Sequence, residues 1–214
     1  MTTSERAPVL PPVVSPEEWS AARESLLAEE KELTRALDRL AAKRRRLPAV
    51  RIDTPYEFEG PEGTRTLLDL FGDRQQLALY QFMDNGPDAF CPGCTHLTDN
   101  VTDLATLAEA GVAWVTVSDM PLAQMQQYWA EHGWDVPFYS SHGTTFSADM
   151  GAGGGFLLNV FLRDGDDVYR TYSTTHRGVD RVLFVNNVLD LAPYGRQEDW
   201  EDSPEGWPQH PTYG

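Results

Sequence analysis

The two cysteines of the chain stand three residues apart, in the run Cys91-Pro92-Gly93-Cys94. The run lies where an apolar segment, typical of a buried strand over residues 77–83, gives way to apolar residues at helical spacing. A helix start offers unpaired N–H groups and a partial positive charge, which stabilise a thiolate and lower its pKa. The spacing therefore predicts that Cys91 is an exposed nucleophile and that Cys94, one turn further on, is a shielded resolving thiol.

The elements around the pair alternate between strands and helices. Strands are predicted over 77–83, 112–117, 156–162 and 168–172, helices after Cys94, at 122–132 and at 178–191, and a short hairpin around 60–63. This β-α-β-α-β-β-α order predicts an α/β fold, a thioredoxin-like sandwich of the peroxiredoxin type. It also places strand 156–162 antiparallel to the first two strands and strand 168–172 parallel to them.

The N-terminal segment has a different pattern. Ser15, Pro16 and Glu18 are typical of a capped helix start, and apolar residues then recur at three- and four-residue steps until Pro48. We expect a segment 1–50 with one long amphipathic helix, a thioredoxin-like domain 51–193 and an acidic, aromatic-rich, irregular tail 194–214. The helix either packs on its own domain or forms the seam of a homodimer.

The net charge of −16 is unevenly distributed. Residues 52–214 carry 25 acidic and 7 basic side chains, so they would repel a phosphate backbone, and nucleic-acid binding is not expected. No apolar stretch approaches the roughly 20 residues of a membrane span, and no secretory leader is apparent. We therefore expect a cytoplasmic protein, in which a lone cysteine pair is more often catalytic or metal-binding than structural.

Five short motifs resemble those of a bacterial domain-of-unknown-function family whose members are described as predicted dithiol–disulfide oxidoreductases of thioredoxin-like fold. The motifs are Phe90 to Asn100, Val117 to Leu122, Gly133 to Ser141, Phe161 to Gly165, and Thr171 to Thr174 with Arg177-Gly178. The resemblance runs from about Ser15 to the end of the chain. It implies that Cys91 and Cys94 are the redox pair of the family.

Two features depart from ordinary thioredoxins. The segment facing the pair, Gly153 to Leu158, lacks the usual cis-proline, which would leave space beside the sulfurs for another ligand. In addition, His96, His142 and His176 lie in motifs around the pair. Topology places His142 and His176 at the sheet edge that carries Cys91, whereas His96 is about 200° around the helix from Cys94.

Three functions are compatible with these residues. The first is an oxidoreductase that needs no cofactor, in which Cys91 attacks a disulfide or a peroxide, Cys94 resolves the product and His176 assists proton transfer. The second is a copper protein or copper-dependent oxidase (zinc being less expected), with ligands drawn from Cys91, Cys94, His96, His142 and His176. The third is a non-catalytic, dimeric interaction module. In the first two, the substrate is a thiol, a disulfide or a small molecule, and Trp134, Phe138 and Tyr139 could line a pocket for an aromatic one.

Overall fold

The computed structural model describes residues 10–210 of the chain. Its contacts divide the chain into two compact units. One unit comprises residues 48–187 and holds the sheet and the cysteine pair. The other comprises the residues up to Leu47 together with the C-terminal segment from Val188.

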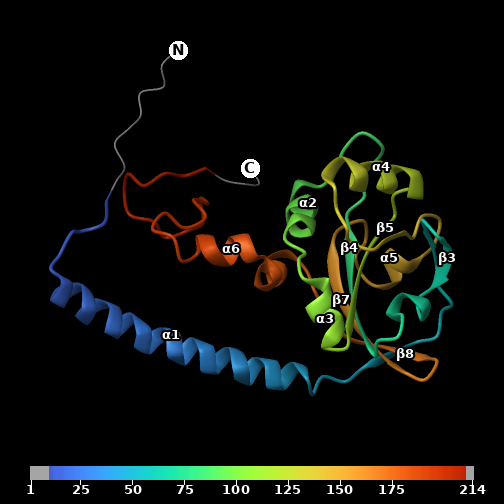
Figure 1. The fold of residues 1–214 in the computed structure, drawn as a ribbon, viewed down its shortest axis with the longest axis horizontal. Helices are drawn as coiled ribbons and strands as arrows, with labels where there is room; N and C mark the ends of the chain where they lie inside the picture. The colour runs from blue at the N-terminus through green and yellow to red at the C-terminus, as the bar shows by residue number, and fades with distance from the viewer. Residues whose placement is uncertain (1–9, 211–214) are drawn as a thin grey trace, which may run out of the picture. The chain divides into compact units, whose positions relative to one another are not determined.

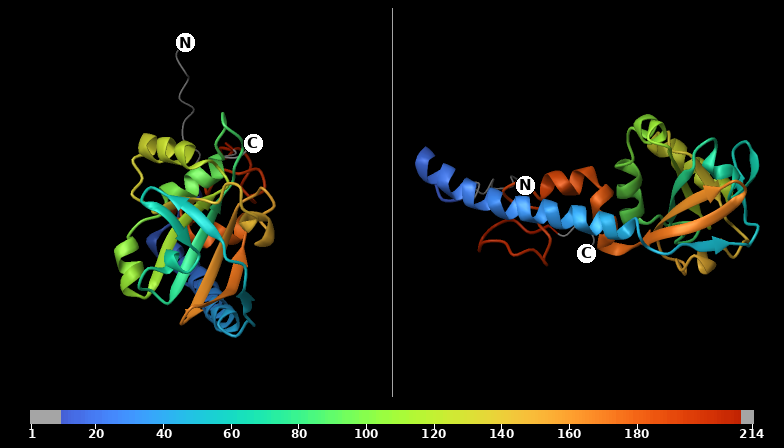
Figure 2. Two further views of the ribbon diagram at one scale, coloured as in Figure 1. Left: turned by 90° about the vertical axis from the view of Figure 1, so that its right-hand side faces the viewer. Right: turned by 90° about the horizontal axis from the view of Figure 1, so that it is seen from below.

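The sheet of the larger unit has eight strands in the order β1-β8-β7-β4-β5-β6-β2-β3. The strands are β1 (Val50–Ile52), β2 (Glu57–Gly60), β3 (Gly63–Thr66), β4 (Gln76–Phe82), β5 (Val112–Ser118), β6 (Phe138–Ser140), β7 (Leu157–Asp164) and β8 (Asp167–Thr174). β2 and β3 form the predicted hairpin. Figure 2 shows β7 and β8 as a second, longer hairpin.

The centre of the sheet has the thioredoxin arrangement. β4 is parallel to β5, with Leu79 opposite Val115, and antiparallel to β7, with Leu79 opposite Asn159. β8 is antiparallel to β7 and so returns parallel to β4. The strand order β5-β4-β7-β8 and its directions confirm the predicted thioredoxin-like α/β fold.

Helices cover both faces of this sheet. They are η1 (Asp69–Phe71), α2 (Pro92–Asp99), α3 (Leu104–Glu109), α4 (Leu122–His132), α5 (Phe146–Asp149), η2 (His176–Val182) and α6 (Phe184–Leu189). Alternate residues of β4 point to opposite faces. Leu77 and Leu79 join a core cluster with residues of η1 and α5, and Tyr80 and Phe82 join a second cluster with residues of α2 and α4. In Figure 1, α2 and α5 accordingly lie on opposite sides of β4.

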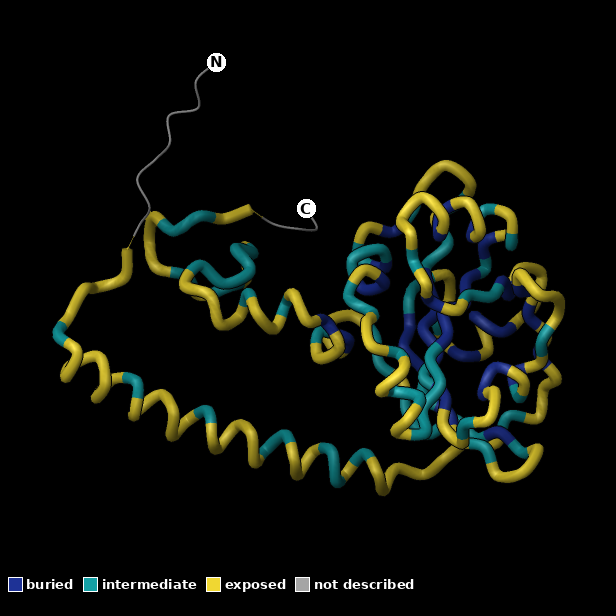
Figure 3. The backbone as a smooth tube through the Cα atoms, viewed as in Figure 1, coloured by how far each residue is buried: buried dark blue, intermediate teal, exposed yellow. Residues whose placement is uncertain are grey.

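The N-terminal helix, α1 (Pro16–Arg44), begins as its sequence predicts. The Glu18 N–H donates to Ser15 Oγ over 3.2 Å, and the Ser15 N–H donates to Glu18 Oε2 over 3.0 Å. This capping box satisfies two N–H groups at the helix start. None of the residues of α1 is buried, in contrast with the sheet (Figure 3).

The helical pattern after the cysteine pair is broken into two helices, although the spacing from Leu97 to Ala108 predicted a single one. Asp103 adopts a left-handed conformation with φ of 52°, and its side chain accepts from the Thr106 N–H over 3.2 Å. Asp103 thus caps a new helix, α3, and interrupts the old one.

The predicted helix over 178–191 is also wrong. The segment forms the 3₁₀ helix η2, an extended residue at Leu183 and the short helix α6. The side-chain amide of Asn187 donates to the carbonyl groups of Asp180 and Leu183. Side-chain bonds of this kind compete with a continuous helix.

The C-terminal segment from Val188 is irregular to residue 210. Arg196 forms a two-point ion pair with Asp190, in which Nε and a terminal nitrogen each donate over 2.6 Å. The Glu201 carboxylate accepts from the N–H groups of Arg196 and Glu198. Across the described residues, no helix is long and apolar enough to cross a membrane.

Candidate redox site

Cys91 is the N-cap residue of α2, reached from β4 through a loop that is closed by a bridge between Asp84 and Phe90. Its Sγ accepts the Cys94 backbone N–H over 3.2 Å. The side chain thus takes the place that a serine or aspartate oxygen fills at other helix starts. Pro92, at the first helical position, has no N–H that would need a partner.

The surroundings of Cys91 favour its thiolate. The Cys94 thiol donates a hydrogen bond to Cys91, and the backbone N–H groups of Cys94 and Gly93 add to it. These donors outweigh the opposing effect of burial and lower the pKa of Cys91 to about 6. A large fraction of Cys91 is therefore ionised at neutral pH.

Cys94 has the opposite character. It is fully buried, whereas Cys91 keeps 8% of its surface exposed, and both are free thiols. Donation to Cys91 and burial raise the pKa of Cys94. The two cysteines are therefore divided into an ionised, accessible thiol and a protonated, shielded one, as their spacing predicts.

Two groups from the end of β4 counteract the raised pKa of Cys94. The Met83 N–H donates to Cys94 Sγ over 3.4 Å, and the Tyr80 side chain forms a hydrogen bond with Cys94 that lowers its pKa. Tyr80 is itself only 1% exposed. Sequence reasoning missed Tyr80, although a phenol inside an otherwise apolar strand is a signal that its hydroxyl needs a partner.

Aromatic side chains surround the start of α2. The rings of Phe90 and Tyr128 are stacked with their centroids 3.5 Å apart, and the Tyr128 hydroxyl lies 2.7 Å from Thr95 Oγ1. Phe90 directly precedes Cys91, and Tyr128 comes from α4. These contacts attach both the loop before Cys91 and the first turn of α2 to α4.

Phe156 occupies the place where thioredoxins carry the cis-proline. It precedes β7 and packs against the buried cluster that contains both cysteines. Its ring centroid is 6.5 Å from that of Tyr80 and 5.8 Å from that of His176. The space that the absent proline was expected to leave is thus bordered by an aromatic side chain.

The three histidines do not gather with the cysteines around one point. His96 Nε2 lies 3.0 Å from Asn186 Oδ1, and His142 Nδ1 lies 2.9 Å from the Asp119 carbonyl oxygen. His176 is exposed at the start of η2. In the described part of the chain, no three His, Cys, Asp or Glu side chains form a group that could hold a metal ion. The expected copper ligand set therefore does not fit this arrangement.

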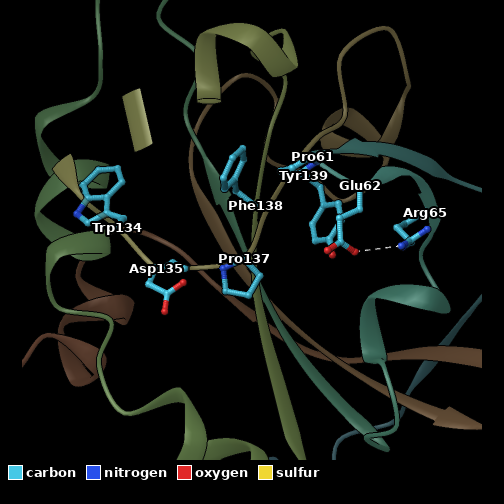
Figure 4. Close-up of a pocket in the computed structure, with 9 residues that line it drawn as sticks. Pro61, Glu62, Arg65, Trp134, Asp135, Pro137, Phe138 and Tyr139 are labelled. Carbon is cyan, nitrogen blue, oxygen red and sulfur yellow. Dashed lines mark hydrogen bonds and ion pairs between the residues drawn. The ribbon is translucent and has the colours of Figure 1, made fainter. Parts of the chain in front are cut away.

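Two cavities lie close to Trp134. One of about 380 Å³ is lined by residues of the β2–β3 turn and of segment 134–139, and Figure 4 shows the Glu62–Arg65 ion pair at its border. The other, of about 510 Å³, lies between the C-terminal end of α2, the start of α3 and the end of α4. Neither is lined by Cys91 or Cys94, so the predicted aromatic pocket at 134–139 does not open onto the sulfurs.

Solved structures with partial similarity include peroxidoxin BcpB from Mycobacterium tuberculosis (22% identity over 64% of this chain and 94% of that one, TM-score 0.44). An uncharacterized thioredoxin-like protein from Porphyromonas gingivalis (18%, 67% and 93%, TM-score 0.44) and PrxQ from Xylella fastidiosa (15%, 62% and 88%, TM-score 0.40) are others. No curated protein matches the chain. The model of the family described as "Bacterial protein of unknown function (DUF899)" matches residues 8–213, and the chain belongs to this family.

Proposed function

We propose that the protein is a thiol–disulfide oxidoreductase that works through Cys91 and Cys94. The observation that carries the proposal is the division of the pair. Cys91 is ionised and accessible at the start of α2, and Cys94 is protonated and buried one turn further on. An ionised thiol beside a protonated resolving thiol is what a dithiol exchange reaction needs.

The reaction follows from these two states. The Cys91 thiolate attacks one sulfur of a substrate disulfide, forms a mixed disulfide with it and releases the other sulfur as a thiolate. Cys94 then loses its proton and attacks Cys91 Sγ, which releases the second substrate sulfur as a thiolate. Two electrons pass to the substrate, and an external dithiol must reduce the new Cys91–Cys94 disulfide.

Tyr80 and the Met83 N–H support the second step. Cys94 must become a thiolate within a buried site, which is costly without hydrogen-bond donors. Both groups contact its sulfur and favour the ionised form. Once Cys91 is in the mixed disulfide it carries no charge, so the repulsion and the hydrogen bond that hold Cys94 protonated are lost.

The direct test is the reduction of a peptide disulfide by the reduced protein in metal-free buffer, with dithiothreitol as the final reductant. We expect turnover in the wild type, a Cys91–Cys94 disulfide when dithiothreitol is omitted, and no turnover in Cys91→Ser. Hydrogen peroxide in place of the peptide tests the other oxidant that the sequence allowed. A pair that stays reduced with both oxidants would refute the proposal.

A further inference from the structure

One row of large apolar side chains on α1 repeats every seven residues. It consists of Trp19, Leu26, Leu33, Leu40 and, just past the end of the helix, Leu47. Their exposed fractions lie between 42% and 61%, and α1 has no buried residue. The row is visible to solvent along the whole of α1 (Figure 3).

A strict seven-residue spacing indicates which kind of partner fits the row. An α-helix has 3.6 residues per turn, so a seven-residue repeat drifts by about 20° per heptad on a straight helix. Two helices that wind around each other with a left-handed supercoil remove this drift and keep the row facing the partner. The spacing therefore favours another helix as the partner.

The charge of α1 indicates which helix it is. Residues 16–32 carry six acidic and two basic side chains, and residues 33–47 carry six basic and one acidic side chain. A second copy of α1 in the opposite direction would place each acidic half along a basic half. In the same direction, it would place like charges side by side.

The helix dipole does not account for this distribution. Its influence is confined to the first and last turns, where Glu17, Glu18, Lys43 and Arg44 lie. The residues that directly precede the four leucines continue the trend through the interior of the helix, in the order Ser25, Glu32, Arg39 and Arg46. Residues beside an apolar row lie along the border of a helix pair and set its direction.

We propose that the protein forms an antiparallel homodimer through α1. The seven-residue apolar row of each copy forms the seam, and the acidic half of each helix lies along the basic half of the other. This proposal concerns the N-terminal unit and does not depend on the redox chemistry of Cys91.

The oligomeric state of the full chain is the first test, measured by gel filtration with light scattering. We expect a dimer for the wild type and a monomer for Leu33→Glu, which places a charge at the middle of the row. Leu27→Glu is the matched control, because Leu27 is the same residue type on α1 but lies outside the row. It should remain a dimer, and helix content by circular dichroism should be equal in all three.

The direction of the helices is the second test. Spin labels are attached to Ser25→Cys or to Thr34→Cys in a protein that also carries Cys91→Ser and Cys94→Ser. Thr34 lies next to the middle of the row and Ser25 nine residues from it. In an antiparallel pair, the label-to-label distance should be about 27 Å greater at position 25 than at 34, from a rise of about 1.5 Å per residue.

Each other result would overturn the proposal. A wild type that is a monomer at all concentrations has no such seam. A Leu33→Glu variant that stays a dimer locates the interface elsewhere. Short distances at both labelled positions show parallel helices. An unchanged alkylation rate of Cys91 in Leu33→Glu would show that the redox site is intact in that variant, so the two proposals fail or stand separately.

Discussion

The Cys94 N–H donates to Cys91 Sγ over 3.2 Å, while the Cys94 thiol hydrogen of the same residue also serves Cys91. One residue thus supplies both its backbone and its side chain to hold the neighbouring thiolate. The helix start fixes this geometry, because Cys91 is the N-cap of α2 and Cys94 its third residue. The nucleophile and its stabilising donor are therefore parts of one short segment.

Alkylation of Cys91 should follow this arrangement. Only the thiolate reacts with iodoacetamide, so the rate should rise with pH and be half-maximal near pH 6, against about 8.5 for an ordinary thiol. The measurement is the rate of modification between pH 4 and 10, with Cys94→Ser measured in parallel. In Cys94→Ser, the thiol donor is replaced by a hydroxyl, so a low pKa should largely persist. A midpoint above pH 8 in the wild type would contradict the assigned ionisation.

The same pKa affects stability. The folded-state pKa of Cys91 lies below that of the unfolded chain, so ionisation stabilises the folded, reduced protein. This contribution is complete above about pH 8.5 and is lost as the pH falls through about 6. Urea unfolding of the reduced wild type and of Cys91→Ser over this range should show a difference that shrinks toward acid pH.

Cys94→Ser should trap the first half of the reaction. Cys91 can still attack a peptide disulfide, but no thiol remains to release the peptide, so a mixed disulfide should accumulate with one peptide per chain. Mass spectrometry without reductant measures it, and Cys91→Ser is the control that should capture no peptide. Capture by Cys91→Ser instead would reverse the roles of the two cysteines.

Tyr80→Phe should slow the resolving step. A hydrogen bond to a charged group contributes about 1.5–3 kcal/mol, so loss of the phenol hydroxyl predicts release of the peptide about 10- to 100-fold more slowly. The alkylation midpoint of Cys91 should stay near pH 6, because Tyr80 contacts Cys94. Tyr56→Phe is the control, since Tyr56 is also buried but donates to Asp149. Equal release rates in both variants would remove Tyr80 from the mechanism.

Local sequence signals predicted the parts of the structure that local interactions determine. The capping box at Ser15, the central strands and the division of Cys91 and Cys94 depend on neighbours within a few residues. The contact of Tyr80 with Cys94 and the place of Phe156 depend on which strand face meets α2. The single sequence contains that information only as a pattern shared by many pairings.

The expectations that failed involve conformations that a side chain imposes on its own backbone. The left-handed Asp103 divides one predicted helix into two, and the Asn187 amide interrupts another. The histidines illustrate a different limit. Topology places His142 and His176 at the correct sheet edge, but an edge is wider than the sphere of ligands around a metal ion.

Gly60→Ala should destabilise the sheet through Tyr139. An added Cβ at Gly60 would lie 2.6 Å from two carbons of the Tyr139 ring, which must then move. Overpacking of this kind costs about 1–3 kcal/mol, measurable as a lower urea midpoint with an unchanged slope. In a Tyr139→Ala background the same substitution should cost little. An equal cost in both backgrounds would show that the strand itself, and not the ring, resists the methyl group.

Copper binding gives the sharpest comparison between the geometry and the alternative drawn from the sequence. If only the two thiols can reach a shared ion, the affinity of the reduced protein for Cu(I) should be the same within about twofold in the wild type, His142→Ala and His176→Ala. Competition with a chromophoric Cu(I) chelator measures this affinity, and Cys91→Ser is the control that should lose it. A tenfold loss in either histidine variant, equal to about 1.4 kcal/mol, would show that the imidazole is a ligand and that its loop moves toward the sulfurs when the metal binds.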